Sequence, residues 1–414
     1  WSIQTNGFPE EKKDVGKVTR RKEKINMKQV RMGIIGFGVQ GGGYAGFITE
    51  GKVEGMVLGG ICDIDPEKKK KAEEKYPDVP FFENYADMIE SGKVDCVITT
   101  VPHYLHPVIG IYAIEHGMPV IIEKPAGVYT KQVRKLIECS KAHPDVPFAI
   151  MFNQRTNPLY IEVKKIMDSG ELGKLRRTNW IINNWWRSTN YYNQSAWRAT
   201  WGAEGGGVLV NQAPHQLDLI QWICGKPKKV YANCKFGSHR DIVVENDVTA
   251  ILDYGEGATG VFITCTHDFD GTDRFEIDCD GGKIVIENSK RAVVHKFVKT
   301  EDEIDKTFTP EMSAKLFRGE GEMEKYEERI IEFPSAWGSQ HCIVMKNFAD
   351  HLLYGTPIMA PGADGINGVK LANAMLLSSW LGKEVDYEFD EDLYIEELNK
   401  RIKEEGKYPL IEEN

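Results

Sequence analysis

A glycine-rich motif that directly follows an apolar stretch limits the fold of this chain more than any other feature. The stretch is Val30–Ile35, and the motif is Gly36-Phe37-Gly38-Val39-Gln40-Gly41. Gly36 and Gly38 lack the Cβ atoms that would obstruct a tight turn and the close approach of a pyrophosphate, and Gly41 lets the next helix pack on a sheet. Because a strand precedes the motif and a helix follows it, we expect a Rossmann domain that binds a dinucleotide.

An acidic residue, Asp63, ends the next apolar stretch, Leu58–Cys62. A carboxylate at this position can accept hydrogen bonds from the adenosine ribose and repel a 2′-phosphate, so we expect NAD in preference to NADP. Asp63 could instead cap the helix that begins near Pro66, although Asp65 is better placed for that position. A glycine-rich turn that binds no cofactor would leave Asp63 unexplained.

Apolar strand candidates alternate with helix-like segments through the first third of the chain. This alternation predicts a parallel sheet in a domain that spans residues 27–153. The expected strands are Val30–Ile35, Met56–Cys62, Val94–Thr100, Val120–Ile122 and Phe148–Phe152, and the expected helices include Pro66–Lys75, Ala86–Ser91, Val108–His116 and Lys131–Ala142.

Beyond Arg155 the pattern changes to one helix followed by long β-rich stretches, which predicts a second, α+β domain over residues 154–390 with a large, mostly antiparallel open sheet. The charge-dense region 301–332 is expected to be an excursion on the surface. The C-terminal helices could pack back on the first domain, and residues 391–414 form a C-terminal segment. The expected elements are the helix Leu159–Ser169, the strands Leu175–Ile182, Lys229–Phe236, Val248–Tyr254, Ala258–Thr266, Arg274–Asp280 and Lys283–Glu287, and the helices Gln340–Tyr354 and Gly365–Leu381.

The net charge and the cysteine pattern indicate which partners and which cellular compartment to expect. Of the 414 residues, 62 are acidic and 52 are basic, a formal charge of -10 that argues against binding to nucleic acid or anionic membranes. Eight scattered cysteines form no Cys-x-x-Cys pair and predict reduced thiols. With no bilayer-length apolar run and no secretory signal core, we expect a cytoplasmic protein. Residues 1–26 are interpreted as a tail or leader, either a disordered extension or an arm that embraces a partner subunit.

A lysine follows the strand Val120–Ile122, in the tripeptide Glu123-Lys124-Pro125. Beside a nicotinamide, the ammonium group of Lys124 would lie where a substrate hydroxyl loses its proton while hydride leaves the same carbon. We therefore expect a protein that oxidises or reduces an alcohol.

Several motifs in combination resemble the Gfo/Idh/MocA oxidoreductases, which include glucose-fructose oxidoreductase and inositol dehydrogenase, over about residues 30–380. The resemblance implies a Rossmann domain, a C-terminal α/β domain whose open sheet often forms dimers or tetramers, and a sugar or cyclitol bound between the domains. The motifs are Gly36-x-Gly38-x-x-Gly41, Val101-Pro102-His103-Tyr104-Leu105-His106, Glu123-Lys124-Pro125, Gly170-Glu171-Leu172-Gly173 and Gly205-Gly206-Gly207-Val208-Leu209-Val210-Asn211-Gln212-Ala213-Pro214-His215.

By this resemblance Lys124 and His215 are the catalytic pair. Lys124 can polarise the reacting oxygen, and His215 can shuttle the proton near neutral pH. Many family members have aspartate where this chain has Asn211, which cannot act as a base but can orient a sugar hydroxyl. We expect Asn211, His215 and Asp218 on one helical face. Alternatively, Asn211 is a helix cap and His215 a structural histidine.

The loops at the expected nicotinamide site complete the cofactor-binding set. His103 and His106 lack further spaced ligands, so we expect no metal site, although His106 could assist catalysis. The expected cofactor-binding residues are Gly36, Phe37, Gly38, Val39, Gln40, Gly41, Asp63, Thr100, Pro102, His103, His106, Glu123 and Lys124.

Aromatic residues alternate with amides, hydroxyls and arginines over residues 185–201, which suits the C–H faces and hydroxyl groups of a sugar. A core or subunit-interface cluster is the alternative interpretation. Two further residues, at the crossing between the domains, are placed to line the cleft. The expected substrate contacts are Trp185, Arg187, Tyr192, Trp197, Asn153, Arg155 and Asn211.

The leading hypothesis is an NAD-dependent dehydrogenase that acts on a secondary hydroxyl of a sugar, glycoside or cyclitol, as a homo-oligomer. Asn211 to His215 and the tryptophan-rich loop look like members that oxidise glucosides at C3. One alternative is redox-neutral glycoside cleavage, but the Gly-Gly-His-Gly-Gly pattern of the family's glycosidases is absent. The other is a non-catalytic sugar or NAD sensor, against which the presence of both Lys124 and His215 argues.

Overall fold

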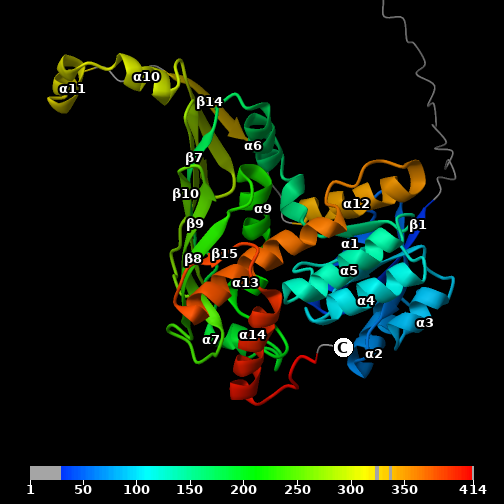
Figure 1. The fold of residues 1–414 in the computed structure, drawn as a ribbon. Helices are drawn as coiled ribbons and strands as arrows, with labels where there is room; N and C mark the ends of the chain where they lie inside the picture. The colour runs from blue at the N-terminus through cyan, green and yellow to red at the C-terminus, as the bar shows by residue number, and fades with distance from the viewer. Residues whose placement is uncertain (1–28, 322–325, 335–337, 413–414) are drawn as a thin grey trace, which may run out of the picture.

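A computed structural model describes residues 29–321, 326–334 and 338–412. These residues form two sheets, each with its own helices (Figure 1). The predicted tail, residues 1–26, lies outside the described residues. Within the described part of the chain, no helix is both long and apolar enough to cross a membrane. All eight cysteines have free thiols, as predicted.

The first sheet is parallel and has the strand order β3-β2-β1-β4-β5-β6. Its central strands are apolar and buried because helices cover both faces. The order reverses between β1 and β4, the place where parallel sheets of this kind bind ligands. The strands are β1 (Val30–Ile35), β2 (Met56–Cys62), β3 (Phe81–Phe82), β4 (Cys96–Thr99), β5 (Val120–Ile122) and β6 (Phe148–Ile150), with helices α1 (Val39–Thr49), α2 (Pro66–Lys75), α3 (Tyr85–Glu90), α4 (Leu105–Glu115) and α5 (Thr130–Ala142).

The second sheet has nine strands in the order β14-β13-β12-β11-β7-β10-β9-β8-β15. Neighbours are antiparallel except β7 and β10, which run parallel, so the predicted mostly antiparallel sheet is confirmed. The strands are β7 (Leu175–Ile182), β8 (Lys229–Phe236), β9 (Glu245–Gly255), β10 (Ala258–Cys265), β11 (Asp273–Cys279), β12 (Gly282–Glu287), β13 (Arg291–Phe297), β14 (Tyr326–Glu332) and β15 (Val385–Asp386).

Three helices, α6 (Pro158–Ser169), α9 (Pro214–Cys224) and α13 (Gly365–Leu381), cover one face of the second sheet (Figure 1). Strands such as β8 and β9 alternate buried and exposed residues, because only one face meets this helical layer. Helix α14 (Glu391–Glu405) packs on the same core. Helix α12 (Ser339–Tyr354) instead packs on the core of the first sheet, through residues such as Phe348.

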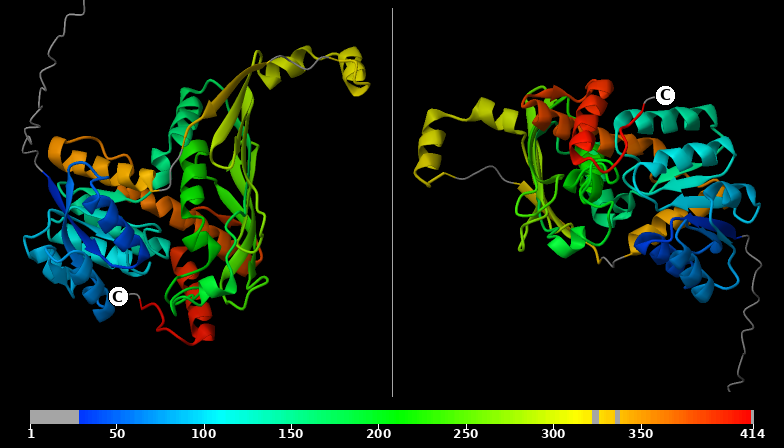
Figure 2. Two further views of the ribbon diagram at one scale, coloured as in Figure 1. Left: turned by 180° about the vertical axis from the view of Figure 1, so that it is seen from behind. Right: turned by 90° about the horizontal axis from the view of Figure 1, so that it is seen from below.

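The interpretation of residues 301–332 as a surface excursion is wrong for its last part. Strand β14 pairs with β13 and forms one edge of the sheet. Its residues are almost all exposed, so the sequence has no buried alternation to reveal the strand. Helices α10 (Glu301–Thr307) and α11 (Pro310–Phe317) do project away from the body of the molecule (Figure 2).

Candidate active site

The predicted cofactor residues gather at the carboxyl edge of the parallel sheet. The glycine motif follows β1, Asp63 follows β2, the segment from Thr100 to His106 follows β4, and Glu123 and Lys124 follow β5. Parallel strands bring these four connections to the same edge. The structure therefore brings together all of the residues that the sequence assigned to cofactor binding.

Two glycines of the motif have steric reasons to lack a side chain, and the third leaves open space. Gly36 has φ +96°, and a Cβ there would lie 2.6 Å from the carbonyl oxygen of Thr100. A Cβ at Gly41 would lie 2.0 Å from the carbonyl oxygen of Gly36. At Gly38 a Cβ would meet no atom within 4 Å, so the loop is open in front of the N-terminus of α1. This open side, with the N-terminal amides of α1 behind it, fits a pyrophosphate.

The carboxylate of Asp63 holds the glycine loop. Its Oδ2 atom accepts a hydrogen bond from the backbone N–H of Phe37 at 2.7 Å, and its Oδ1 atom accepts one from Asp65 at 2.9 Å. Asp65 caps α2 by accepting from the N–H of Glu67, so the alternative role considered for Asp63 belongs to Asp65. An open groove of about 570 Å³ adjoins this loop. It is lined by Phe37, Gly38, Val39, Gly42, Lys68, Lys71, Glu74 and Lys75.

Lys124 is part-buried beside the carboxylate of Glu123, which accepts hydrogen bonds from the backbone N–H of Lys124 and from the hydroxyl of Tyr44. The Nζ atom of Lys124 donates to the backbone carbonyl oxygen of Asn211 at 2.9 Å, which joins the first domain to the second. Burial lowers the pKa of Lys124, and the negative charges of Glu123 and Glu204 oppose that shift. The ammonium group is thus fixed at the boundary between the two domains.

The chain bends between Asn211 and His215. Helix α8 (Val208–Asn211) ends at Asn211, and Pro214 occupies the first turn of α9, where its missing N–H costs no hydrogen bond. The expectation that Asn211, His215 and Asp218 share one helical face is therefore wrong, because only His215 and Asp218 belong to α9. Asn211 is not the cap of α9 either, since that position is Ala213.

His215 lies in the first turn of α9 close to two other basic groups. Burial and the charges of Lys124 and His341 hold the pKa of His215 well below its usual range. The Nδ1 atom of His215 is buried and has no hydrogen-bond partner among the described residues. His215 is therefore a neutral imidazole near pH 7, within electrostatic range of the ammonium group of Lys124.

His341, at the start of α12, adds a further polar group from a third part of the chain. It contacts the side-chain amide of Asn153 at 3.0 Å and lies 5.9 Å from the Tyr44 ring. Burial and the charge of Lys124 lower its pKa to about 4. His341 was not predicted, because nothing in its local sequence indicates a position in the cleft.

A buried carboxylate lies directly behind Asn211. The side-chain amide of Asn211 donates to Glu204, which also accepts from the backbone N–H of Ala199 at 2.5 Å and lies 3.6 Å from the guanidinium of Arg198. Burial raises the pKa of Glu204 to about 7. Glu204 was not predicted, and its glycine-rich surroundings resemble a turn.

The two histidines after β4 are held by carbonyl groups. The Nδ1 atom of His103 lies 2.9 Å from the carbonyl oxygen of Glu204, and that of His106 lies 2.7 Å from the carbonyl oxygen of Pro125. Burial keeps the pKa of both imidazoles below the usual range. These two contacts connect the segment after β4 to the loops that contain Glu204 and Pro125, next to Lys124.

The aromatic segment forms a loop beside Asn211. Tyr191 is its centre, because its hydroxyl accepts from Arg198 at 2.7 Å and from Gln212 at 3.2 Å, while the guanidinium of Arg187 lies 4.9 Å from its ring. Trp197 packs edge-on against His103 with ring centroids 5.5 Å apart.

The remaining predicted aromatic contacts are tied to the second domain. The hydroxyl of Tyr192 lies 2.7 Å from the side-chain oxygen of Thr266, and both Tyr192 and Trp185 pack partly against the core of that domain. Arg187 instead lies over the ring of Tyr191, whose hydroxyl contacts the side-chain amide of Asn211, and Trp197 lies against His103.

Arg155 is buried in an ion-pair network. Its guanidinium donates two hydrogen bonds to Asp218, at 2.8 and 2.6 Å, and one to Asp364 at 2.6 Å. These contacts use both sides of the guanidinium and connect α9 to the segment before α13. They favour a structural role for Arg155, and its predicted contact with substrate stays a prediction.

Comparison with known proteins decides the family. The model described as an oxidoreductase family with an NAD-binding Rossmann fold matches residues 30–150, and the GFO/IDH/MocA C-terminal domain model matches residues 160–285. The chain belongs to the Gfo/Idh/MocA oxidoreductase family. The predicted family, the α/β fold class and NAD as cofactor are confirmed.

Named relatives of this Gfo/Idh/MocA protein are distant. Inositol 2-dehydrogenase of Corynebacterium glutamicum is 25% identical over 198 residues, which cover 48% of this chain and 55% of the relative. The chain thus spans about half the length of this relative. Inositol 2-dehydrogenase/D-chiro-inositol 3-dehydrogenase of Lactiplantibacillus plantarum is 21% identical over 360 residues, 84% of this chain and 90% of the relative.

The fold of this Gfo/Idh/MocA protein matches solved structures over most of its length. The WlbA dehydrogenase from Bordetella pertussis, in complex with NADH and UDP-GlcNAcA, superposes with a TM-score of 0.69 at 22% identity. The match covers 87% of this chain and 100% of that chain.

Proposed function

We propose that this protein oxidises a secondary hydroxyl group of a sugar, glycoside or cyclitol with NAD, and that Lys124 and His215 are its catalytic residues. The proposal rests on the contact between the Nζ atom of Lys124 and the carbonyl oxygen of Asn211, at 2.9 Å. This contact joins the lysine of the Rossmann domain to the chain segment that carries His215.

Lys124 and His215 suit two different roles in the oxidation of a hydroxyl group. A protonated Lys124 can stabilise the negative charge that develops on the substrate oxygen, and a neutral His215 can accept the hydroxyl proton. Nicotinamide, when bound, supplies the hydride acceptor. The negative charges of Glu123 and Glu204 favour the protonated form of Lys124 and oppose the effect of burial, which supports this division of roles.

The surroundings of Asn211 favour a polyhydroxylated substrate. Asn211, Gln212, Arg187 and Arg198 present amide and guanidinium groups beside the rings of Tyr191 and Trp197. Such groups can hydrogen-bond sugar hydroxyls while the rings cover apolar C–H surface. The names of the relatives, inositol dehydrogenases, support the same substrate class.

Oxidation at C3 of a glucoside is the narrower proposal. It depends on the likeness of the segment from Asn211 to His215, together with the tryptophan-rich loop, to family members with that activity. A 3-ketoglycoside has an acidified neighbouring C–H bond, so a partner enzyme that eliminates the aglycone would be able to use the product.

A panel assay tests these proposals. Purified protein and NAD are mixed with glycosides, free sugars and cyclitols, and NADH absorbance and product mass are followed. Net NADH with a ketosugar product supports the dehydrogenase. Aglycone release without net NADH would replace it with redox-neutral glycoside cleavage, and binding without turnover would replace it with a sensor.

We also propose that the protein forms a homo-oligomer through the second sheet. The face opposite α6, α9 and α13 is not covered by any helix of the described chain (Figure 1). Tyr231 and Ile251 pair across β8 and β9 on this face and are 43% and 51% exposed. An apolar surface of this kind is typical of an interface. Light scattering coupled to size-exclusion chromatography measures the assembly, and a monomer would refute it.

A further inference from the structure

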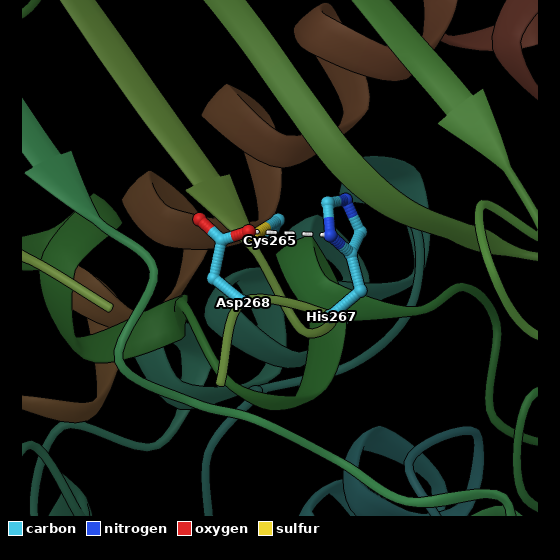
Figure 3. Close-up of side chains that lie close together, drawn as sticks. All are labelled: Cys265, His267 and Asp268. Carbon is cyan, nitrogen blue, oxygen red and sulfur yellow. Dashed lines mark ion pairs between the residues drawn. The ribbon is translucent and has the colours of Figure 1, made fainter. Parts of the chain in front are cut away.

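Three side chains of different ligand types meet where β10 ends (Figure 3). They are Cys265, His267 and Asp268, and one potential ligand atom from each lies within 4.8 Å of the others. None of them takes part in the reaction proposed above. A thiolate, an imidazole and a carboxylate form a ligand set typical of zinc sites.

The two ring nitrogens of His267 face different carboxylates. Nδ1 lies 3.3 Å from Oδ1 of Asp268, on the side of the cluster, and Nε2 lies 3.0 Å from Oδ2 of Asp247 on β9. In metal sites, the ring nitrogen that does not bind the metal commonly donates to a carboxylate, which fixes the tautomer and the ring plane. Asp247 occupies that position, so Nδ1 of His267 is the atom available as a ligand.

Cys265 is the buried member of the cluster. Cys265 is 4% exposed. A cation bound at the cluster would favour the thiolate form of Cys265 over the thiol. His267 and Asp268 are partly exposed, so an ion can enter from solvent.

We propose that Cys265, His267 and Asp268 bind one divalent ion of the zinc class, with Asp247 orienting His267. Three protein ligands leave the fourth tetrahedral position for water. The alternative is a metal-free cluster held by hydrogen bonds among the same four side chains, and the experiment below separates the two.

The position of the cluster suggests what the ion would stabilise. Thr266 lies between two of the ligands, and its side chain contacts the hydroxyl of Tyr192 at 2.7 Å. Its carbonyl oxygen accepts from the backbone N–H of Arg187 at 2.8 Å. An ion bound here would therefore hold the segment that supports the candidate sugar-binding loop, without touching Lys124 or His215.

The test is metal binding by the purified full chain. The protein is stripped with a chelator and titrated with Zn²⁺ against a chromophoric competitor, and separately with Co²⁺ while thiolate-to-cobalt charge-transfer absorption is followed. We expect one ion per chain and a thiolate band. Both should be lost in Cys265→Ser and His267→Gln, and Asp247→Asn should weaken Zn²⁺ binding about 10- to 100-fold.

Cys139→Ser is the matched control, because Cys139 also has a histidine neighbour, with its sulfur 3.9 Å from Nδ1 of His143, and belongs to no cluster of three ligands among the described residues. It should leave binding unchanged. Circular dichroism checks that each variant is folded. If Cys265→Ser is not folded, metal binding by Asp268→Asn and Asp247→Asn provides the test. Absence of a stoichiometric ion, absence of the cobalt band, or wild-type binding by the folded ligand variants would overturn the proposal.

Discussion

Asn211 donates a hydrogen bond from its side-chain amide to the buried carboxylate of Glu204. Glu204 therefore supplies the carboxylate that lies directly behind Asn211. The charge of Glu204 acts on Lys124, where it opposes the lowering of the pKa by burial. The side chain of Asn211 thus has a buried negative charge behind it, and that charge also acts on Lys124.

This relationship makes Asn211→Asp harmful on its own. The new carboxylate would face Glu204, and two like charges in contact would force one of them to take up a proton. We expect kcat/KM to fall about tenfold or more, and Asn211→Asp/Glu204→Gln to recover most of the loss, with a coupling of about 1–3 kcal/mol. A double-mutant cycle on kcat/KM measures this coupling, and additive effects would show that the two side chains act independently.

The pH dependence of kcat/KM for oxidation should have two limbs. In the proposed reaction His215 is the base when neutral, and its depressed pKa places the acid limb below about 6.5. Lys124 acts when charged, and burial lowers its pKa, so activity should fall as pH rises through a value below about 10.4. In His215→Gln the acid limb should vanish and the plateau should fall about 10²- to 10⁴-fold. An acid limb that persists in this variant would assign it to another group.

Asp63→Ala should weaken NAD binding and relax the preference for NAD over NADP. The variant loses the carboxylate that accepts from the N–H of Phe37, and the adjoining groove carries Lys68, Lys71 and Lys75, which favour a 2′-phosphate. We expect the ratio of kcat/KM values for the two cofactors to change at least about tenfold toward NADP.

Asp65→Ala is the control for this cofactor experiment, because it removes only the cap of α2. It should reduce stability by about 1 kcal/mol and leave the cofactor ratio unchanged. If the ratio of kcat/KM values for NAD and NADP were the same in wild type and Asp63→Ala, Asp63 would have no role in cofactor preference.

Arg155→Met should destabilise the protein by about 3–5 kcal/mol, because it leaves the carboxylate of Asp218 buried without its partner. Arg31→Met is the matched control, since Arg31 binds Asp95 through the same two nitrogens on the surface. It should change the melting temperature little. A stable Arg155→Met protein with a raised KM would instead support the predicted substrate contact.

The glycine motif, Lys124 and five of the six strands of the parallel sheet could be predicted because their signals are local, whereas the two-residue strand β3 was missed. Each strand is a continuous apolar run, and the motif specifies its own turn. In the second sheet, the strands from β7 to β12 were predicted, and β13, β14 and the two-residue strand β15 were missed. In β14 nearly every side chain is exposed, so charge density hides the strand.

The polar surroundings of the site could not be predicted in the same way. Glu204 lies in a glycine-rich turn and His341 on a helix more than a hundred residues from His215. Their importance depends on burial and on partners brought together by the fold. Arg155 was predicted to contact substrate from its position at the domain crossing. The fold instead pairs its guanidinium with Asp218 and Asp364, which the local sequence does not reveal.

The most direct test of the central claim is hydride transfer by Lys124→Met, which keeps much of the side-chain volume and removes the charge. Single-turnover NADH formation is measured with saturating NAD and a substrate found in the panel, and NAD affinity is measured separately. Lys70→Met, on the exposed side of α2, is the control. We predict a rate at least about 100-fold lower with folding and NAD binding retained, whereas a rate within about tenfold of wild type would contradict the catalytic role of Lys124.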